Sequence, residues 1–202
     1  MPEAAPTETH PIKLPHPRTE GPLSLEAALP LRRSVREFST KSLTMDEISQ
    51  LLWAAQGVTD PSGHRTVPSA GATYPLELYL VTGDGLLQYM PDDHSLLQLR
   101  DKDLRKELFN ASLEQEFILE APATFVFTAV YARTEQRYGP SRSPRYIHME
   151  VGHAAQNMML QAVALGLGTV PVGAYEDASV TRVLNLPIDH IPLYLVPVGH
   201  PR

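Results

Sequence analysis

The sequence predicts an α+β fold, in which helices flank a mixed, mostly antiparallel central sheet. Two long segments show the apolar period of a helix, and short apolar runs typical of strands lie between them. The 202 residues are 43% apolar and 20% charged, which suffices for one sizeable core. Residues 1–23 differ, because six prolines exclude a helix there and leave little apolar surface. We therefore expect one domain over residues 24–202, preceded by a proline-rich arm that is either disordered or wraps over a neighbour.

The first elements of this domain have clear boundaries. A helix is predicted to follow Thr44, which forms a capping box with Glu47, and to end at Gly57. Its apolar residues share one face. Two strands follow, over residues 76–82 and 86–90, and a turn with two glycines joins them. This hairpin supplies an antiparallel pair to the sheet.

The second half alternates helices and strands around one long helix. That helix is predicted over residues 146–165, because an apolar stripe runs along it and Gly166 and Gly168 stop it. The other expected elements are a helix over 103–110 with a second helical piece up to 119, a buried strand over 124–131, a strand or extended segment over 169–175, a short helix over 178–184 and a final strand over 191–198.

The composition restricts the function. The net charge of −6 argues against a nucleic-acid-binding protein, because backbone phosphates attract a basic surface. The absence of cysteine excludes disulfides, thiolate zinc sites and a cysteine nucleophile. No apolar stretch reaches the roughly 18 residues of a membrane span, and the N-terminus lacks a signal pattern. We therefore expect a soluble, cytoplasmic protein that binds a small molecule.

A basic cluster precedes the helix that starts after Thr44. Arg32, Arg33, Ser34 and Arg36 fall within five residues. Guanidinium groups match the geometry of a phosphate and stay charged, and a serine hydroxyl adds a short hydrogen bond. The segment is therefore a candidate phosphate clamp, although a solvated basic turn has the same composition.

Two segments of small residues allow a flat ligand to approach the main chain. The first contains Pro68, Ser69, Ala70 and Gly71, and the second contains Pro171, Val172 and Gly173. A plain loop before the strand at residue 76 would have the same composition as the first. The C-terminal His200 and Arg202 add basic groups that could return to the clamp. An anion clamp with two backbone surfaces is what a flavin mononucleotide requires.

Other familiar motifs do not fit this chain. His148 and Glu150 match half of a zinc deaminase motif, but the cysteines that complete it are missing. His148 and His153 lie five residues apart on the long helix and point to different faces, so with Glu150 they do not form a metal site. A nucleophile elbow, a P-loop and a dinucleotide-binding glycine motif are also missing from the sequence. Acyl transfer, nucleotide hydrolysis and a Rossmann nicotinamide site are therefore disfavoured.

Five segments occur in the order found in the nitroreductase superfamily, which the chain resembles over residues 25–202. They are RRSVREF, the helix ISQLLWAA, PSAGATYPLELYLV, EVGHAAQNMMLQAVALGLGTVPVGAY and the terminal PVGHPR. The chain looks most similar to the branch of SagB-type dehydrogenases. The resemblance implies a nitroreductase-like fold, FMN as cofactor and a homodimer with the long central helix at its interface.

The resemblance also implies roles for single residues. The phosphate and ribityl chain of FMN would be held by Arg32, Arg33 and Ser34, with Arg36, His200 and Arg202 close by. Residues 68–71 would lie along the flavin of the partner chain, and a backbone N–H of residues 171–173 would bond flavin N5. The implied reaction is ping-pong hydride or electron transfer between NAD(P)H or a small substrate and an acceptor such as a quinone or nitroaromatic.

One position departs from the azole-forming members of the SagB-type branch. A Lys-Tyr pair before the long helix is implicated in their reaction, whereas this chain has Arg145 and Tyr146. Arginine is a poor general base because it does not readily lose its proton. Tyr146 is then either a catalytic residue or an aromatic side chain packed at the interface.

Three functions stay open: reduction of small acceptors, oxidation of a peptide-derived azoline or another small substrate, and flavin storage without turnover.

Overall fold

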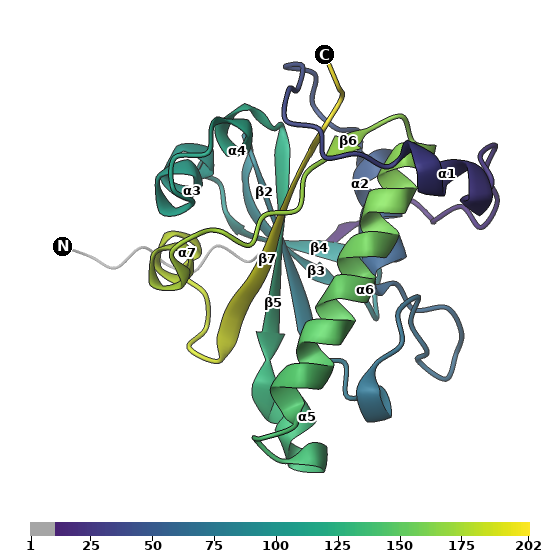
Figure 1. The fold of residues 1–202 in the computed structure, drawn as a ribbon, viewed down its shortest axis with the longest axis vertical. Helices are drawn as coiled ribbons and strands as arrows, with labels where there is room; N and C mark the ends of the chain where they lie inside the picture. Colours follow the sequence, from purple (N-terminus) through teal and green to yellow (C-terminus); the bar gives the residue numbers. More distant parts are fainter. Residues whose placement is uncertain (1–10) are drawn as a thin grey trace.

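The computed structural model describes residues 11–202, and its centre is a seven-stranded sheet with the order β1-β4-β3-β2-β5-β7-β6 (Figure 1). The strands are β1 (Ile12–Lys13), β2 (Leu76–Thr82), β3 (Gly85–Met90), β4 (Ser95–Arg100), β5 (Ala123–Val130), β6 (Gly168–Thr169) and β7 (His190–Gly199). Each strand pairs with its neighbours in antiparallel orientation. The predicted α+β class and the mostly antiparallel sheet are therefore confirmed.

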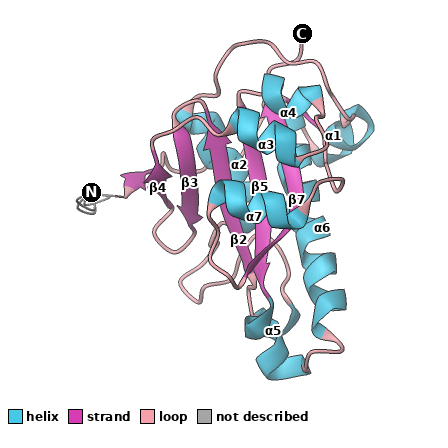
Figure 2. Ribbon diagram, turned by 90° about the vertical axis from the view of Figure 1, so that its left-hand side faces the viewer, coloured by secondary structure: helices cyan, strands magenta, loops and turns pink. Residues whose placement is uncertain are grey.

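Helices cover both faces of this sheet (Figures 1 and 2). They are α1 (Leu25–Leu31), α2 (Met45–Gln56), the 3-10 turn η1 (Ala70–Ala72), α3 (Arg105–Ala111), α4 (Glu116–Glu120), α5 (Tyr131–Tyr138), α6 (Ser143–Ala164) and α7 (Asp177–Leu184). The first face is covered by α2 and α6, and the opposite face by α3, α4 and α7. Within residues 11–202, no helix is both long enough and apolar enough to cross a membrane.

The core forms where strand side chains alternate between the two faces. Every residue of β5 is buried, as expected for a central strand with helices on both sides. Phe125 and Phe127 point to the face covered by α2 and α6, while Val126 points to the other. The predicted capping box of α2 is present: Thr44 accepts from the Glu47 N–H and the Glu47 side chain accepts from the Thr44 N–H.

Several boundaries differ from the sequence prediction for local reasons. The long helix begins at Ser143, three residues early, because proline in the first turn sacrifices no helical hydrogen bond. The helical piece predicted up to residue 119 is the separate helix α4, since Leu113 and Glu114 have φ of 55° and 53° and interrupt the helix. Of the segment 169–175, the pairing strand β6 includes only Thr169.

Besides the short elements β1 and η1, one strand and two helices had no prediction. β4 reads SLLQLR, in which two adjacent leucines obscure the alternation of a strand. α1 contains Pro30, and α5 is polar except for its two tyrosines and one alanine. These helices depend on tertiary packing rather than on a strong apolar period.

The described part of the proline-rich arm lies along its own domain. β1 pairs with β4, and Leu14 is buried. Ser49 on α2 donates from its hydroxyl to the Pro15 carbonyl at 2.6 Å. The Gln50 side chain bonds both the N–H and the carbonyl of Arg18. Residues 1–10 of the predicted arm lie outside the described residues.

Candidate functional site

Segments from three parts of the sequence meet at one end of the sheet. The Val35 N–H donates to the Thr169 carbonyl at 2.9 Å, and the Ser39 N–H donates to the His200 carbonyl at 2.8 Å. The arginine-rich segment 32–38 therefore lies between the segment that follows α6 and the C-terminal segment. Main-chain hydrogen bonds hold all three, so their positions do not depend on flexible side chains.

Glycines allow these segments to approach closely. A Cβ atom on Gly168 would lie 2.7 Å from the Val35 side chain, and one on Gly199 would lie 2.9 Å from the ring of Phe38. The Arg202 N–H also donates to the Glu37 carbonyl at 3.2 Å. A side chain at either glycine would push residues 35–38 away and disrupt this junction.

The arginines of the junction have different surroundings. Arg32 is the C-cap of α1, and Arg33 donates from Nη1 to the Arg32 carbonyl at 2.8 Å. The Arg36 guanidinium lies 5.7 Å from the ring centroid of Phe117, which belongs to α4. All three side chains are partly or largely exposed, as a clamp for an incoming anion requires.

The two C-terminal basic residues are paired with carboxylates. Arg202 Nη2 lies 3.7 Å from Glu120 Oε2 in a largely exposed pair, and such pairs contribute at most about 1 kcal/mol. Arg202 can therefore exchange Glu120 for a phosphate at little cost. His200 Nε2 lies 3.6 Å from Glu47 Oε1, and both side chains are mostly buried. At this distance the two side chains are not hydrogen-bonded, and the His200 main chain, through its carbonyl, holds the C-terminal segment to Ser39.

The small-residue segment 68–71 lies away from this junction, beside the first turns of α6. Ser69 Oγ accepts from the Tyr74 N–H at 2.9 Å, and Arg137 Nη1 donates to the Gly71 carbonyl at 3.1 Å. Gly71 has φ of 62°, and a Cβ atom there would lie 2.8 Å from the Tyr138 hydroxyl. The surface formed by residues 68–71, called the platform below, is therefore rigidly held by α5.

The platform and Gly173 lie on different faces of α6. Gly173, His148 and Gly152 line a hollow of about 230 Å³ on one face. The platform reaches α6 through the contact of Ser69 with Glu150. Glu150 is two residues from both His148 and Gly152, which places it roughly 160° around the helix from them. One chain therefore does not bring its platform and its Gly173 onto the same small ligand.

The segment Pro171–Gly173 offers one main-chain N–H to a ligand. Proline has none, and the Val172 N–H donates to the Leu195 carbonyl at 2.8 Å. Gly173 is exposed, and its N–H remains as the donor of this segment.

Tyr146 packs near the platform rather than near the basic junction. Its ring lies 4.9 Å from that of Tyr138, centroid to centroid, in an edge-to-face arrangement. Tyr138 in turn contacts Gly71. Arg145 is exposed. The ring contact agrees with an aromatic packing residue, and it leaves a catalytic role for the Tyr146 hydroxyl open.

Glu150 is a buried carboxyl that the sequence prediction did not assign to the site. It is 3% exposed, and burial raises its pKa to about 7, while the Ser69 hydroxyl and the charge of Arg65 partly offset this effect. Its Oε1 has no hydrogen-bond partner within residues 11–202. One feature of the sequence could have indicated that this glutamate is buried: it lies next to Val151, within the apolar stripe of the long helix.

Comparisons with known proteins agree with the fold and the order of these segments. The model described as "Nitroreductase family" matches residues 31–200. A candidate nitroreductase of Methanocaldococcus jannaschii is 48% identical over 183 residues, which cover 88% of this chain and 91% of that protein. A crystal structure of a candidate nitroreductase from Ralstonia eutropha has a TM-score of 0.87 and 32% identity, and covers 98% of this chain and 93% of its own.

More distant relatives are longer proteins. The trifolitoxin-processing protein of Rhizobium leguminosarum bv. trifolii is 31% identical over 71% of this chain and 43% of its own length. The FMN reductase (NADPH) of Bacillus subtilis is 26% identical over 84% of this chain and 62% of its own length. This chain therefore spans about half the length of these two relatives.

The raised pKa of Glu150 predicts a pH-dependent contribution to stability. Between pH 4.5 and about 7 the unfolded chain loses the Glu150 proton while the folded protein keeps it. The free energy of unfolding therefore falls as pH rises through this window, by up to about 3 kcal/mol. Glu150→Gln should remove this fall, so the variant gains stability relative to wild type between about pH 5 and about pH 7.5. Urea unfolding at both pH values measures the difference, with exposed Glu116→Gln as control, and an equal difference at both would contradict the assignment.

Proposed function

The chain belongs to the nitroreductase family of oxidoreductases, and from this premise we propose that it uses FMN and works as a homodimer. The observation that carries the proposal is the junction of residues 32–38, 168–172 and 199–202. Its main chain is held by hydrogen bonds, and its arginines are partly or largely exposed. One such cluster suits the single terminal phosphate of FMN, because an FAD site would have to hold a diphosphate and an adenosine as well.

The residues present fit FMN. Arg32, Ser34 and Arg36 would hold the phosphate and ribityl chain, with Arg202 released from Glu120. The Gly173 N–H would bond the ring at N5. When bound, FMN accepts a hydride from a donor such as NAD(P)H and passes electrons to an acceptor such as a quinone or nitroaromatic. The name of the Bacillus subtilis relative, FMN reductase (NADPH), supports both the cofactor and the donor.

A second copy of the chain completes the site in this proposal. The platform and Gly173 lie on different faces of α6, so the platform would cover the flavin of the partner. The exposed stripe of α6, which includes Arg145, Met149, Gly152 and His153, would form the interface. A glycine in the middle of such a stripe lets two helices approach closely. The site is therefore complete only in the dimer.

The relation to the trifolitoxin-processing protein favours a second candidate, a SagB-type dehydrogenase that oxidises a peptide-derived azoline. Tyr146 would act in that reaction, and Arg145 replaces the lysine of the azole-forming pattern. Because arginine keeps its proton, we favour hydride transfer to a small acceptor. Flavin storage without turnover is the third candidate, and it predicts that NAD(P)H leaves the yellow protein unbleached.

The clamp predicts the cofactor and its affinity. Mass analysis of the released cofactor should find FMN, and FAD would contradict the proposal.

Arg32→Ala should weaken FMN binding by about 1.5–3 kcal/mol, the scale of a hydrogen bond to a charged group. Added salt should weaken wild-type binding more than binding by the variant. Arg182→Ala on α7 removes the same charge from the other side of the sheet, so fluorescence titration should show no change for this control.

The composite site predicts complementation between two defective chains. Arg32→Ala lacks the clamp but keeps the platform, whereas Ala70→Trp blocks the platform but keeps the clamp. Each variant alone should bind FMN weakly, and co-expressed chains should recover tight binding at a fraction of sites. Sedimentation should show a dimer. A folded, FMN-saturated monomer, or no recovery in the mixture, would contradict the shared site.

The role of Tyr146 is tested by rapid-mixing kinetics. Tyr146→Phe should leave reduction of bound FMN by NAD(P)H within about threefold of wild type, because the ring packing on Tyr138 needs no hydroxyl. Tyr138→Phe is the matched control, since it changes the other ring of the pair. A loss of roughly 10²–10⁴ in azoline oxidation with FMN affinity unchanged would identify an acid–base role and favour the second candidate.

A further inference from the structure

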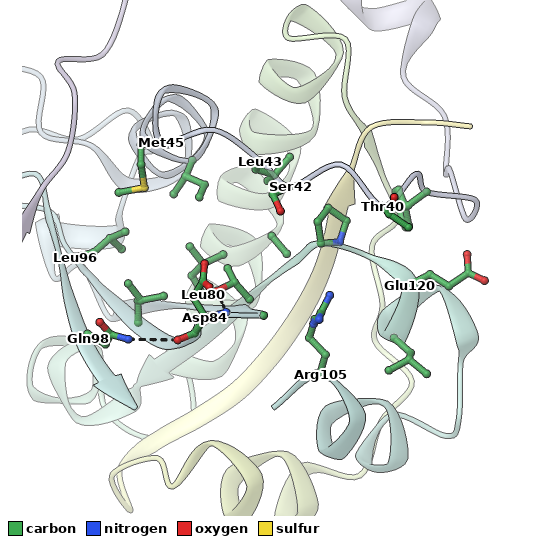
Figure 3. Close-up of a pocket in the computed structure, with 18 of the residues that line it drawn as sticks. Thr40, Ser42, Leu43, Met45, Leu80, Asp84, Leu96, Gln98, Arg105 and Glu120 are labelled. Carbon is green, nitrogen blue, oxygen red and sulfur yellow. Dashed lines mark hydrogen bonds between the residues drawn. The ribbon is translucent and has the colours of Figure 1, made fainter. Parts of the chain in front are cut away.

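A second pocket opens on the face of the sheet that α2 covers, beneath the loop that leads into this helix (Figure 3). Its volume is about 740 Å³, within the range of small-molecule sites. Leu80, Leu87 and Leu96 from three neighbouring strands form an apolar floor, but each is at most 8% exposed, so the floor itself offers little open surface. Leu43 and Ser42 lie above them in the loop.

Exposed apolar side chains surround the entrance. Ile12, Met45 and Leu119 line the pocket and are 37%, 40% and 37% exposed. They come from β1, α2 and α4, so the apolar surface continues from the floor to the rim on several sides. Covering such a surface with an apolar molecule is favourable, because it removes apolar area from water.

The two arginines of the pocket are already paired with carboxylates. Arg105 donates from Nε and Nη2 to the Asp103 carboxylate, which leaves its Nη1 outside this pair. Figure 3 shows the Arg105 guanidinium pointing into the pocket. Arg202 is paired with Glu120, and Asp84 lies on the same rim as Arg105. An anion would therefore face three carboxylates, whereas a neutral oxygen can accept from Arg105 without that repulsion.

We propose that this pocket binds a small, uncharged aliphatic molecule with one oxygen acceptor, such as a medium-chain ketone, whose oxygen is held by Arg105. The aliphatic body lies against the accessible apolar side chains of Ile12, Met45 and Leu119, above the buried leucines. None of the residues proposed to touch FMN is in this pocket except Arg202. The proposal therefore stands whether or not the protein uses a flavin, and its tests need none.

Binding is tested with decan-2-one and the full chain, by calorimetry and by the methyl NMR signals of Leu80, Leu87 and Leu96. We expect saturable binding of one molecule per chain that shifts these methyl signals. Ser42→Trp places an indole at the mouth of the pocket on an exposed residue and should abolish binding. Ser62→Trp makes the same change on an exposed loop outside the pocket and should bind as wild type. Absence of binding by wild type, or equal binding by both tryptophan variants, overturns the proposal.

The chemistry of the head group is tested separately. Arg105→Met should lower the affinity for decan-2-one about tenfold or more, as for the loss of a hydrogen bond from a charged donor. Decanoate has the same chain length and should bind several-fold more weakly than the ketone near neutral pH. Tighter binding of decanoate, or an unchanged affinity in Arg105→Met, overturns the assignment of a neutral ligand held by Arg105. Circular dichroism of each variant confirms that the fold is retained.

Discussion

The pairing of β7 with β5 positions the rest of the molecule. β7 lies between β5 and β6, and its main chain bonds β5 on one side and β6 and Val172 on the other. The same strand carries the chain on to His200, which bonds the arginine-rich segment. One ladder of hydrogen bonds therefore aligns the segment after α6, the C-terminal residues and the guanidinium cluster. A shift of β7 by one residue would turn every inward side chain outward and separate these three segments.

Helix α6 keeps two surfaces apart while it supports both. Its buried stripe fills the core over β5, and its N-terminal part holds the platform through Glu150 on one side and the hollow with Gly173 on another. A helix of 22 residues is rigid enough to keep these surfaces apart. This geometry explains why pocket shape alone does not reveal the proposed cofactor site in one chain. The arginine cluster is an open surface, and the pocket under the 39–45 loop shares only Phe38 and Arg202 with the junction.

The sequence was enough to predict the fold class and most elements, because the signals for them, capping residues and apolar periods, are local. The capping box at Thr44 and the glycines after α6 are examples. β4 and α5 were not predicted, because they are stabilised by packing on neighbouring elements and lack a clear apolar period of their own. Within the candidate site, the sequence indicated Pro171–Gly173 as a unit. It could not show that Leu195 takes the Val172 N–H, since that partner is distant along the chain. Glu150 was missed for the same reason, because its raised pKa depends on tertiary burial.

Both ends of the sheet finish in strands of two residues, β1 and β6. Long, flat edge strands present unpaired main-chain groups that recruit strands from other molecules. Here β1 covers part of β4, and beyond β6 the only continuation is a single parallel bridge from Thr169 to Ser34 within residues 11–202. Among residues 11–202, β1 leaves residues 97–100 of β4 uncovered, and β6 and Val172 leave the first residues of β7 uncovered, so each edge exposes only a short template. Growth into open-ended β-aggregates is therefore disfavoured in the native state.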